Sequence, residues 1–280
     1  GGDDAAVLAV VEQTRAAGVL ARLEKINEVL VSGVLYVLAG PPTPPTAAAD
    51  LHDQVVEAIA ALTIGQPLSL RRLSALVYGV NGLAEVAEVQ LTFRKADPAN
   101  PGAEITGPVA DPFLPAATEL VRPDAANIVV TVLTQLAAAR RDGTKSDVAV
   151  SLLDAAGAAA QFKSFAVDLS VTLRARLANA PDQPPEVVGR FTRAATFVDS
   201  TQFLLSLTPA DAPQLRTGGA DAHDVNAPIE VAVSLAAFGG IAAAGTTVDF
   251  SPGAAPAPAD ARVAAPTART RRKGRAEPRT

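Results

Sequence analysis

The chain of 280 residues contains no cysteine, no methionine and no tryptophan, and only 4% of its residues are aromatic. Without cysteine there can be no disulfide, thiolate nucleophile or Cys-ligated metal, and such chains are typical of a reducing compartment. The chain has only two histidines, His52 and His223, which are few residues from which to build a catalytic triad or a metal site. We therefore expect a protein that is not an enzyme and that carries no cofactor or metal.

Long apolar runs are also absent. No stretch approaches the roughly 20 consecutive apolar residues of a membrane helix, so we expect no membrane insertion. The net charge of −5 does not favour nucleic-acid binding. The first residues, Gly1–Asp4, lack the basic and apolar regions of a signal peptide. Because methionine is missing, we expect the chain to be the C-terminal portion of a longer protein.

The first third of the chain predicts a helix or connector over residues 1–17 and a small α/β domain over residues 18–94. Alternation predicts a strand at 19–24, and the apolar run Val29–Ala39 predicts a second strand that is covered on both faces. The prolines of Gly40–Pro45 end that strand. Two helices should follow, ending at Gly65 and at Asn81-Gly82, before a strand at 87–93. Their apolar faces comprise Leu51, Val55, Ile59, Leu62, Leu70, Leu73, Leu76, Val77 and Val80.

The order strand, strand, helix, helix, strand describes a two-layer α/β sandwich. Residues 95–146 are rich in proline and predict a connector that can hold a strand at Ile128–Leu133. Residues 147–251 alternate with period two, most clearly over Phe165–Leu173, which predicts an antiparallel β-sandwich or partial barrel. Residues 252–280 predict a disordered Pro/Ala linker and a basic tail. The expected fold class is therefore α+β.

Residues 14–93 carry a resemblance to a known family. Thr14–Val19 opens a β-hairpin in which the strand at 19–24 pairs with Val29–Ala39, Leu62–Val77 contains a helix, an Ile-Gly stop and a short helix, and Val80–Val86 enters a strand. In this order the motifs resemble the C-terminal domain of baseplate J-like wedge proteins of contractile phage tails and injection systems. Ala16 stands where that family often has proline, and Leu83 where it often has valine. The signature positions are Gly18, Gly65, Leu70, Leu73, Leu76 and Gly82.

The resemblance implies a structural wedge subunit that surrounds the central hub of a baseplate and relays the contraction trigger by rearranging its interfaces. It implies as partners other wedge subunits, including a second J-like subunit, and baseplate proteins near the sheath or hub. No small-molecule substrate is implied. The implied localisation is the bacterial cytoplasm during assembly and afterwards a phage tail or tail-like particle. Residues 147–251 resemble no family that we can name.

Several short motifs are candidates for chemical sites. Asp221-Ala222-His223-Asp224 places three potential metal ligands within four residues, but a metal site needs further ligands held by the fold. Asp142–Ser146 lacks the glycine spacing of a phosphate loop. Glu85 with Glu88, or Asp211 with Asp221, are the sort of acid pairs found in any soluble chain. None of these patterns identifies a catalytic residue.

Two further interpretations stay open. The basic tail, with Arg269, Arg271, Arg272, Lys273, Arg275 and Arg279, is either a docking segment for an acidic partner or a solvated terminus, and we favour the latter because no aromatic residue interleaves the charges. The β-rich half also permits an adhesin or carbohydrate-binding module. Against this, sugar sites usually use Trp or Tyr, and the only two tyrosines, Tyr36 and Tyr78, lie in the first domain.

Overall fold

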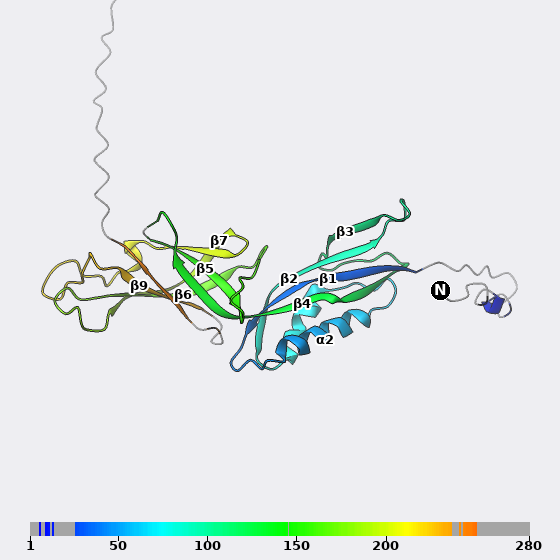
Figure 1. Cartoon of the computed structure of the whole chain (residues 1–280), viewed down its shortest axis with the longest axis horizontal. Coiled ribbons are helices and arrows are strands. Elements are labelled where there is room, and N and C mark those ends of the chain that lie inside the picture. The colour runs from blue at the N-terminus through cyan, green and yellow to red at the C-terminus, as the bar shows by residue number, and fades with distance from the viewer. Residues whose placement is uncertain are drawn as a thin grey trace, which may run out of the picture.

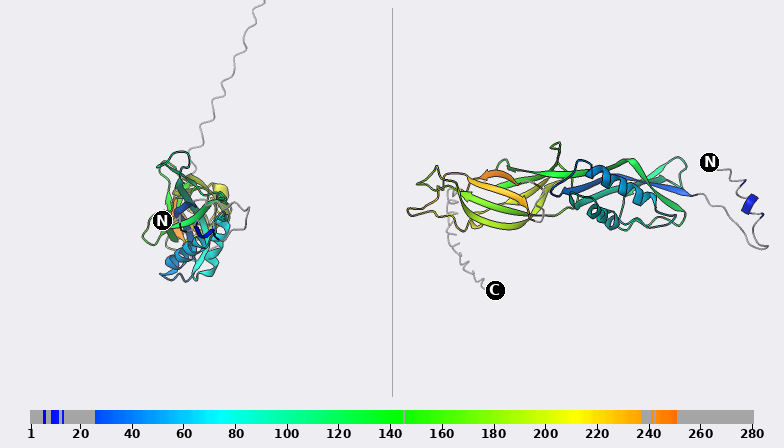
Figure 2. Two further views of the ribbon diagram at one scale, coloured as in Figure 1. Left: turned by 90° about the vertical axis from the view of Figure 1, so that its right-hand side faces the viewer. Right: turned by 90° about the horizontal axis from the view of Figure 1, so that it is seen from below.

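The computed structural model describes residues 6, 9–11, 13, 26–144, 146–236, 241 and 243–250. These residues form an elongated body of two lobes arranged end to end (Figure 1). The body is narrow when viewed along its length (Figure 2). The fold is mixed α/β and consists mostly of strands in two sheets, with few helices among the described residues.

The first lobe contains β1 (Asn27–Ala39), α2 (Ala47–Ala60), α3 (Leu70–Ala75), the 3₁₀ helix η1 (Leu76–Gly79), β2 (Leu83–Ala96), β3 (Glu104–Pro108) and the first part of β4 (Glu119–Arg140). The second lobe contains the rest of β4, β5 (Asp147–Asp154), β6 (Val167–Ala175), β7 (Glu186–Asp199), β8 (Gln202–Ser206), the 3₁₀ turn η2 (Pro209–Asp211), β9 (Ile229–Leu235) and β10 (Ala244–Val248). The ten described strands follow one another in the order β10-β9-β6-β7-β8-β5-β4-β1-β2-β3.

In the first lobe, β1 is the central strand of the sheet β3-β2-β1-β4. It pairs antiparallel with β2 and parallel with β4. The helices cover one face of this sheet, with α2 lying beneath it in Figure 1. Alternate β1 residues point to the helices, as a pleated strand requires. The resulting core includes Val31, Leu35, Val37, Leu51, Val55, Ile59, Leu73, Val77, Leu91, Val121 and Ile128.

The connection from β1 to α2 is held by the turn that precedes β2. The Thr43 hydroxyl donates to the Gly82 carbonyl at 2.8 Å, and the Gly40 N–H donates to the same oxygen at 2.8 Å. Gly82 has φ of 80°. A Cβ at this position would lie 2.3 Å from the Pro42 carbonyl oxygen and 2.4 Å from the Pro44 side chain. Glycine is therefore required at residue 82 for both backbone conformation and space.

The strands of the second lobe pair antiparallel with one another. β7 bends between the two sheets, because its residues up to Ala195 pair with β6 and its later residues pair with β8. At the far end of the order, β10 packs back against β4. The enclosed core includes Val148, Val150, Leu152, Leu169, Val171, Leu173, Phe203, Leu205, Val231 and Val233. In β6 the odd residues are buried and the even residues are more exposed, as the alternation predicted.

Two expectations from the sequence are wrong. Residues 95–146 are not mainly a connector: the expected strand at Ile128–Leu133 is present, but it is part of the 22-residue strand β4, which runs from one lobe into the other, and β3 precedes it. Proline does not prevent this, since Pro108 ends an outer strand and Pro123 adjoins a register irregularity. The expected pairing of β1 with residues 19–24 is also wrong, because β2 and β4 occupy both edges of β1. Residues 14–25 and 251–280 lie outside the described residues, as does most of the expected N-terminal helix.

We expect Gly82→Ala to lower the free energy of unfolding by about 3 kcal/mol or more, because it combines left-handed backbone strain with a clash against backbone. Gly157→Ala is the matched control. Gly157 has φ of 84°, and no heavy atom lies within 4 Å of the place that an added Cβ would take, so strain alone should cost about 1 kcal/mol. Urea denaturation of both variants measures the difference, and equal losses would contradict the close approach at Gly82.

Candidate functional site

The most elaborate cluster of side chains lies at the junction of the two lobes. Tyr36 of β1 faces away from the helices, and its ring lies 5.3 Å from that of Phe162, measured between centroids. Phe162 in turn lies 5.0 Å from Phe165 and 5.7 Å from Phe203. Tilted aromatic pairs at these distances are favourable beyond the area they bury. The cluster thus joins the open face of the first lobe's sheet to the core of the second lobe.

A carboxylate fixes the loop that presents Phe162. Glu88 of β2 accepts the backbone N–H of Lys163 at 2.8 Å, and the N–H and hydroxyl of Ser164 at 3.1 Å each. Hydrogen bonds to a charged acceptor are roughly twice as strong as neutral ones. Because Glu88 belongs to the first lobe and the loop to the second, these bonds set the relative position of the lobes.

Besides the aromatic contact and the Glu88 bonds, the backbone of β4 itself connects the two lobes. Up to Leu133, β4 pairs with β1 on one edge, and from Leu133 it pairs with β5 on the other. The register shifts between Leu133 and Gln135, so that Thr134 is an extra residue in the strand. Leu133 is fully buried together with Leu38 and Tyr36 in the core of the second lobe. One strand therefore contributes to both cores.

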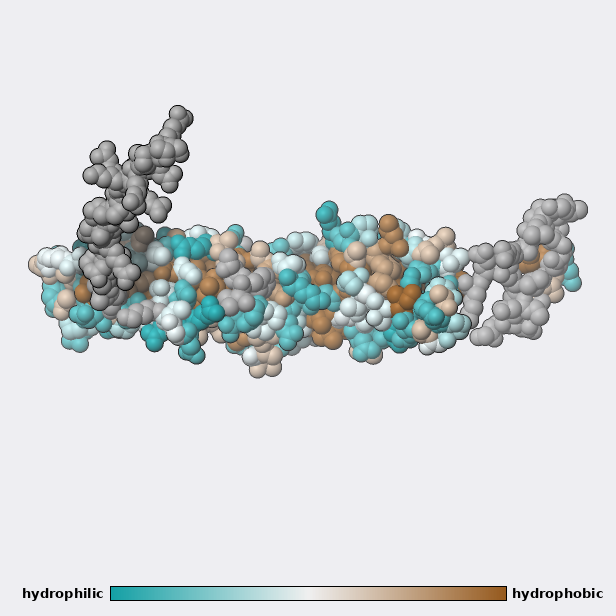
Figure 3. Space-filling view, turned by 90° about the horizontal axis from the view of Figure 1, so that it is seen from above, coloured by the Kyte–Doolittle hydropathy of each residue, from teal (hydrophilic) through white to brown (hydrophobic). Residues whose placement is uncertain are grey.

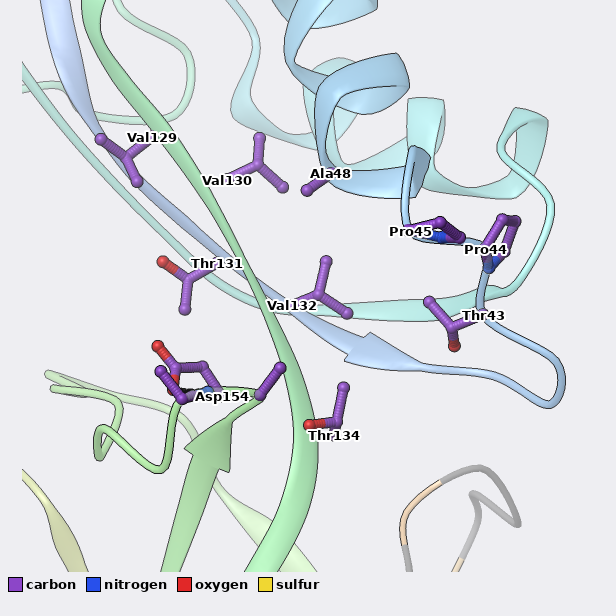
Figure 4. Close-up of a pocket in the computed structure, with 12 residues that line it drawn as sticks. Thr43, Pro44, Pro45, Ala48, Val129, Val130, Thr131, Val132, Thr134 and Asp154 are labelled. Carbon is purple, nitrogen blue, oxygen red and sulfur yellow. Dashed lines mark hydrogen bonds between the residues drawn. The ribbon is translucent and has the colours of Figure 1, made fainter.

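An open groove of about 560 Å³ borders this junction. It is lined by Thr43, Pro44, Pro45, Ala48, Val129, Val130, Thr131, Val132, Thr134 and residues 154–156. In Figure 4 the Pro44–Pro45 turn and the start of α2 lie on one side of β4, and Asp154 lies on the other. Its lining is mostly apolar, with Asp154 as the one charged side chain. The groove offers a surface for an extended chain and no set of groups for chemistry on a substrate.

The proposed metal motif has a different role in the structure. The His223 side chain is 1% exposed, and its Nδ1 accepts the backbone N–H of Arg216 at 2.9 Å. The other ring nitrogen, Nε2, lies 3.5 Å from a Glu186 carboxylate oxygen and is buried without a hydrogen-bond partner in the described structure. Asp224 accepts the N–H of Asn226, and Asp221 is exposed. His223 thus braces its own loop through the bond between Nδ1 and the Arg216 N–H, and the described ranges hold no group of three or more metal-ligating side chains.

The other candidate residues also make local contacts. His52 bonds to Asp53 at 2.9 Å and to the Ala125 carbonyl at 3.1 Å, and both bonds raise the pKa of His52 above its ordinary value. Glu85 is exposed on β2. It does not share the junction contacts of its neighbour Glu88. Residues 142–144 form a turn. These positions do not converge on one site.

Two buried carboxylates stabilise the lobes separately. Burial alone would raise the pKa of Glu119, but hydrogen bonds from Lys95 at 2.7 Å and from the Ala116 N–H at 2.9 Å hold it below its ordinary value. In the second lobe, burial alone would likewise raise the pKa of Asp211. The hydrogen bonds from Arg193 and Thr208 outweigh burial and hold the pKa of Asp211 below its ordinary value. Both carboxylates are therefore charged structural anchors.

The signature positions of the resemblance lie in the first lobe, apart from Gly18, which is outside the described residues. Gly65 has φ of 70° after α2, and Gly82 has φ of 80° before β2. Leu73 is buried, while Leu70 and Leu76 are partly buried against the same core. The Ser69 hydroxyl accepts the Arg72 N–H at the start of α3. These residues determine turns and core packing in the first lobe, so a function of this lobe would depend on other residues at its surface.

No protein-family profile matches the chain. No curated protein matches it significantly. Of the helices in the described part of the chain, none combines the length and the apolar character needed to cross a membrane.

We expect His223→Ala to lower the free energy of unfolding by about 2–3 kcal/mol, because it leaves the partly buried Arg216 N–H without its acceptor and opens a cavity at a side chain that is 1% exposed. Zinc and EDTA should leave the melting temperature of the parent chain unchanged. His52→Ala serves as control and should cost less than about 1 kcal/mol, since His52 lies at the surface. A melting temperature that rises with zinc and loses this response in His223→Ala would contradict the structural role.

Proposed function

We propose that the chain is a non-catalytic structural wedge subunit in the baseplate of a contractile tail or injection system. The observation that carries the proposal is the continuous block β1-α2-α3-β2, in which Gly65 and Gly82 adopt positive φ at the positions of the Ile-Gly and Asn-Gly motifs. The block keeps the helix, the Ile-Gly stop, the short helix and the returning strand of the resemblance over residues 14–93, whereas the hairpin that the resemblance places before them is not formed, because β2 and β4 occupy both edges of β1.

The surface of the first lobe supports an assembly role. Tyr78 of η1 is 74% exposed and Leu114 is 69% exposed. Exposed aromatic and large apolar side chains are favoured anchors in protein interfaces. Polar and apolar areas alternate over the face seen in Figure 3, which suits contacts with several neighbours more than one obligate apolar interface.

The junction supports the relay of a mechanical signal. A wedge subunit that passes on a trigger must move as a unit when its interfaces rearrange. The shared strand β4, the Tyr36–Phe162 contact and the Glu88 bonds connect the lobes at three points. A force on one lobe would therefore displace the other, with no bond chemistry involved.

The remaining parts of the proposal concern partners and place. The neighbours would be other wedge subunits, including a second J-like subunit, and baseplate proteins near the sheath or hub. Assembly would take place in the bacterial cytoplasm, before the chain becomes part of a phage tail or tail-like particle. The second lobe would be an antiparallel, sandwich-like elaboration at the periphery.

A second candidate is a binding module in the second lobe. The observation that favours it is a hollow of about 320 Å³ lined by Pro209, Leu215, Thr217, Asp224, Val225, Ala227, Ile229 and Phe250. The lining is mainly apolar and the one aromatic ring is Phe250, whereas sugar platforms are usually Trp or Tyr. A strong and selective signal on a glycan array, lost in Phe250→Ala, would favour this candidate over the wedge.

The wedge proposal predicts that co-expression with the genomic neighbours yields ring- or tail-like particles that contain the chain, visible by negative-stain microscopy. Tyr78→Ala should reduce incorporation at least about tenfold, as loss of an interface anchor does, with no change in the stability of the free chain. Arg71→Ala is the control, since its side chain is 93% exposed. Free monomer alone, without any particle, would contradict the proposal.

A further inference from the structure

One stretch of strand edge in the first lobe is left open. Among the described residues, the edge of β4 that faces away from β1 is paired only from Leu133 onward, by β5. Its beginning is protected: the Glu119 carbonyl accepts the Gly65 N–H, Arg122 reaches the Ala60 carbonyl, and Pro123 has no N–H to offer. The register with β1 shifts between Pro123 and Ile128. The unprotected part is therefore residues 128–132.

An unpaired edge of this kind is a template for another strand. Every second residue of a strand directs its N–H and C=O to a given edge, so residues 128–132 offer backbone groups to a partner. Natural proteins usually protect such edges with proline, charge or a bulge. Residues 128–132 are Ile-Val-Val-Thr-Val, without any of these, and Val129 is 48% exposed.

The groove described above runs along this open edge and limits what can occupy it. The turn at Pro44 and Pro45 stands on one side, and the Asp154–Ala156 turn on the other. β5 takes the same edge from Leu133 onward. A single extended chain fits beside residues 128–132, whereas the edge of a folded sheet would meet β5 and its neighbours. At the end of the groove, the Thr134 hydroxyl is buried without a hydrogen-bond partner in the described structure.

We propose that residues 19–23 of a second copy of this chain add to β4 as an extra strand beside residues 128–132. This is strand addition in trans, in which backbone hydrogen bonds supply affinity and alternate side chains supply specificity. It concerns how two copies associate and does not depend on the particle proposed above.

The sequence of the segment fits the groove. Residues 19–23 read Val-Leu-Ala-Arg-Leu, and their alternation predicts a strand. Within its own chain this strand has no place beside β1, whose two edges are occupied. Its length of five residues equals that of the open stretch. Arg22 is its one charged residue and is opposite in sign to Asp154, the one charged side chain that lines the groove.

The distance from Asn27 to the open stretch shows that residues 19–23 must come from a second copy of the chain, because those of the same chain are too close to Asn27 to extend that far. In the pairing of β1 with β4, Asn27 lies beside Glu119 and Gly33 lies beside Ile128. The start of the open stretch, at Ile128, is therefore six residues further along the strands than Asn27, a distance of about 20 Å at 3.3 Å per residue. It also lies two strand spacings, about 10 Å, to the side. The four residue steps from Leu23 to Asn27 span at most about 14 Å. Leu23 of the same chain therefore cannot lie along residues 128–132.

Because the chain has no cysteine, single cysteines can test the contact in the full chain. Ala21→Cys and Thr131→Cys variants are purified separately, mixed and oxidised, and a second pair uses Leu20→Cys and Val130→Cys for the opposite face of the strand. We expect disulfide-linked heterodimers from at least one pair, at several times the yield of Ala21→Cys mixed with Asp53→Cys on the exposed face of α2. Equal yields from all mixtures would overturn the proposal. So would a disulfide within one chain in the Ala21→Cys, Thr131→Cys double variant.

Sedimentation of the full chain gives an independent measurement. The parent chain should associate with rising concentration, and at least one of Leu20→Pro and Ala21→Pro should weaken association at least about tenfold, because one of these two consecutive residues directs its N–H to the ladder and proline removes that donor. Ala21→Ser, which keeps the N–H, should behave as the parent does. A parent chain that stays monomeric at about 100 µM, a concentration that populates any dimer with a dissociation constant below about 100 µM, would overturn the proposal. So would association of both Leu20→Pro and Ala21→Pro that equals that of Ala21→Ser.

Discussion

The structure depends on a strand that is longer than either lobe needs. β4 has 22 residues, and a strand of that length spans roughly 70 Å at 3.3 Å per residue. Its first part completes the sheet that α2 covers, and its last part begins the sheet of the second lobe. Around Leu133 the same backbone therefore changes neighbours from β1 to β5. The burial of Leu133, Leu38 and Tyr36 in the second core makes the change possible without a flexible linker.

The other contacts at the junction follow from this constraint. β4 fixes the direction of the second lobe, and the loop that carries Phe162 therefore lies over the open face of β1 and β2. There Phe162 packs against Tyr36, and the Lys163 N–H donates to Glu88. The remaining part of that strand edge, residues 128–132, lies between the protected beginning of β4 and the start of β5. The same strand that joins the lobes therefore also creates the surface to which we assign a second copy.

Local patterns in the sequence predicted much of each lobe. Apolar residues at helical spacing indicated α2 and the α3–η1 segment, and Gly65 and Gly82 indicated their ends. Strict alternation indicated β6 and β9, because each buries one face. These features depend on side chains a few residues apart, which the sequence displays directly.

Contacts between distant residues were not predictable in this way. β4 was divided into a connector and a short strand because Pro123 and the preceding prolines favoured a loop, although proline is tolerated at the edge of a sheet. The parallel pairing of β1 with β4 joins residues about 90 positions apart. The aromatic residues of the junction did carry a signal, since Phe162 and Phe165 are close together among few aromatics. Their partner Tyr36 could be identified only from the fold. His223 was noticed as a ligand candidate, but its burial depends on the loops of the second lobe.

The central claim is that the two lobes form one mechanical and thermodynamic unit through β4 and the Tyr36–Phe162 junction. Differential scanning calorimetry of the full chain tests it most directly. The account predicts one transition with a calorimetric enthalpy equal to the van't Hoff enthalpy, as for a cooperative single unit. Two separate transitions, or a calorimetric enthalpy well above the van't Hoff value, would show that the lobes unfold independently and would contradict the account.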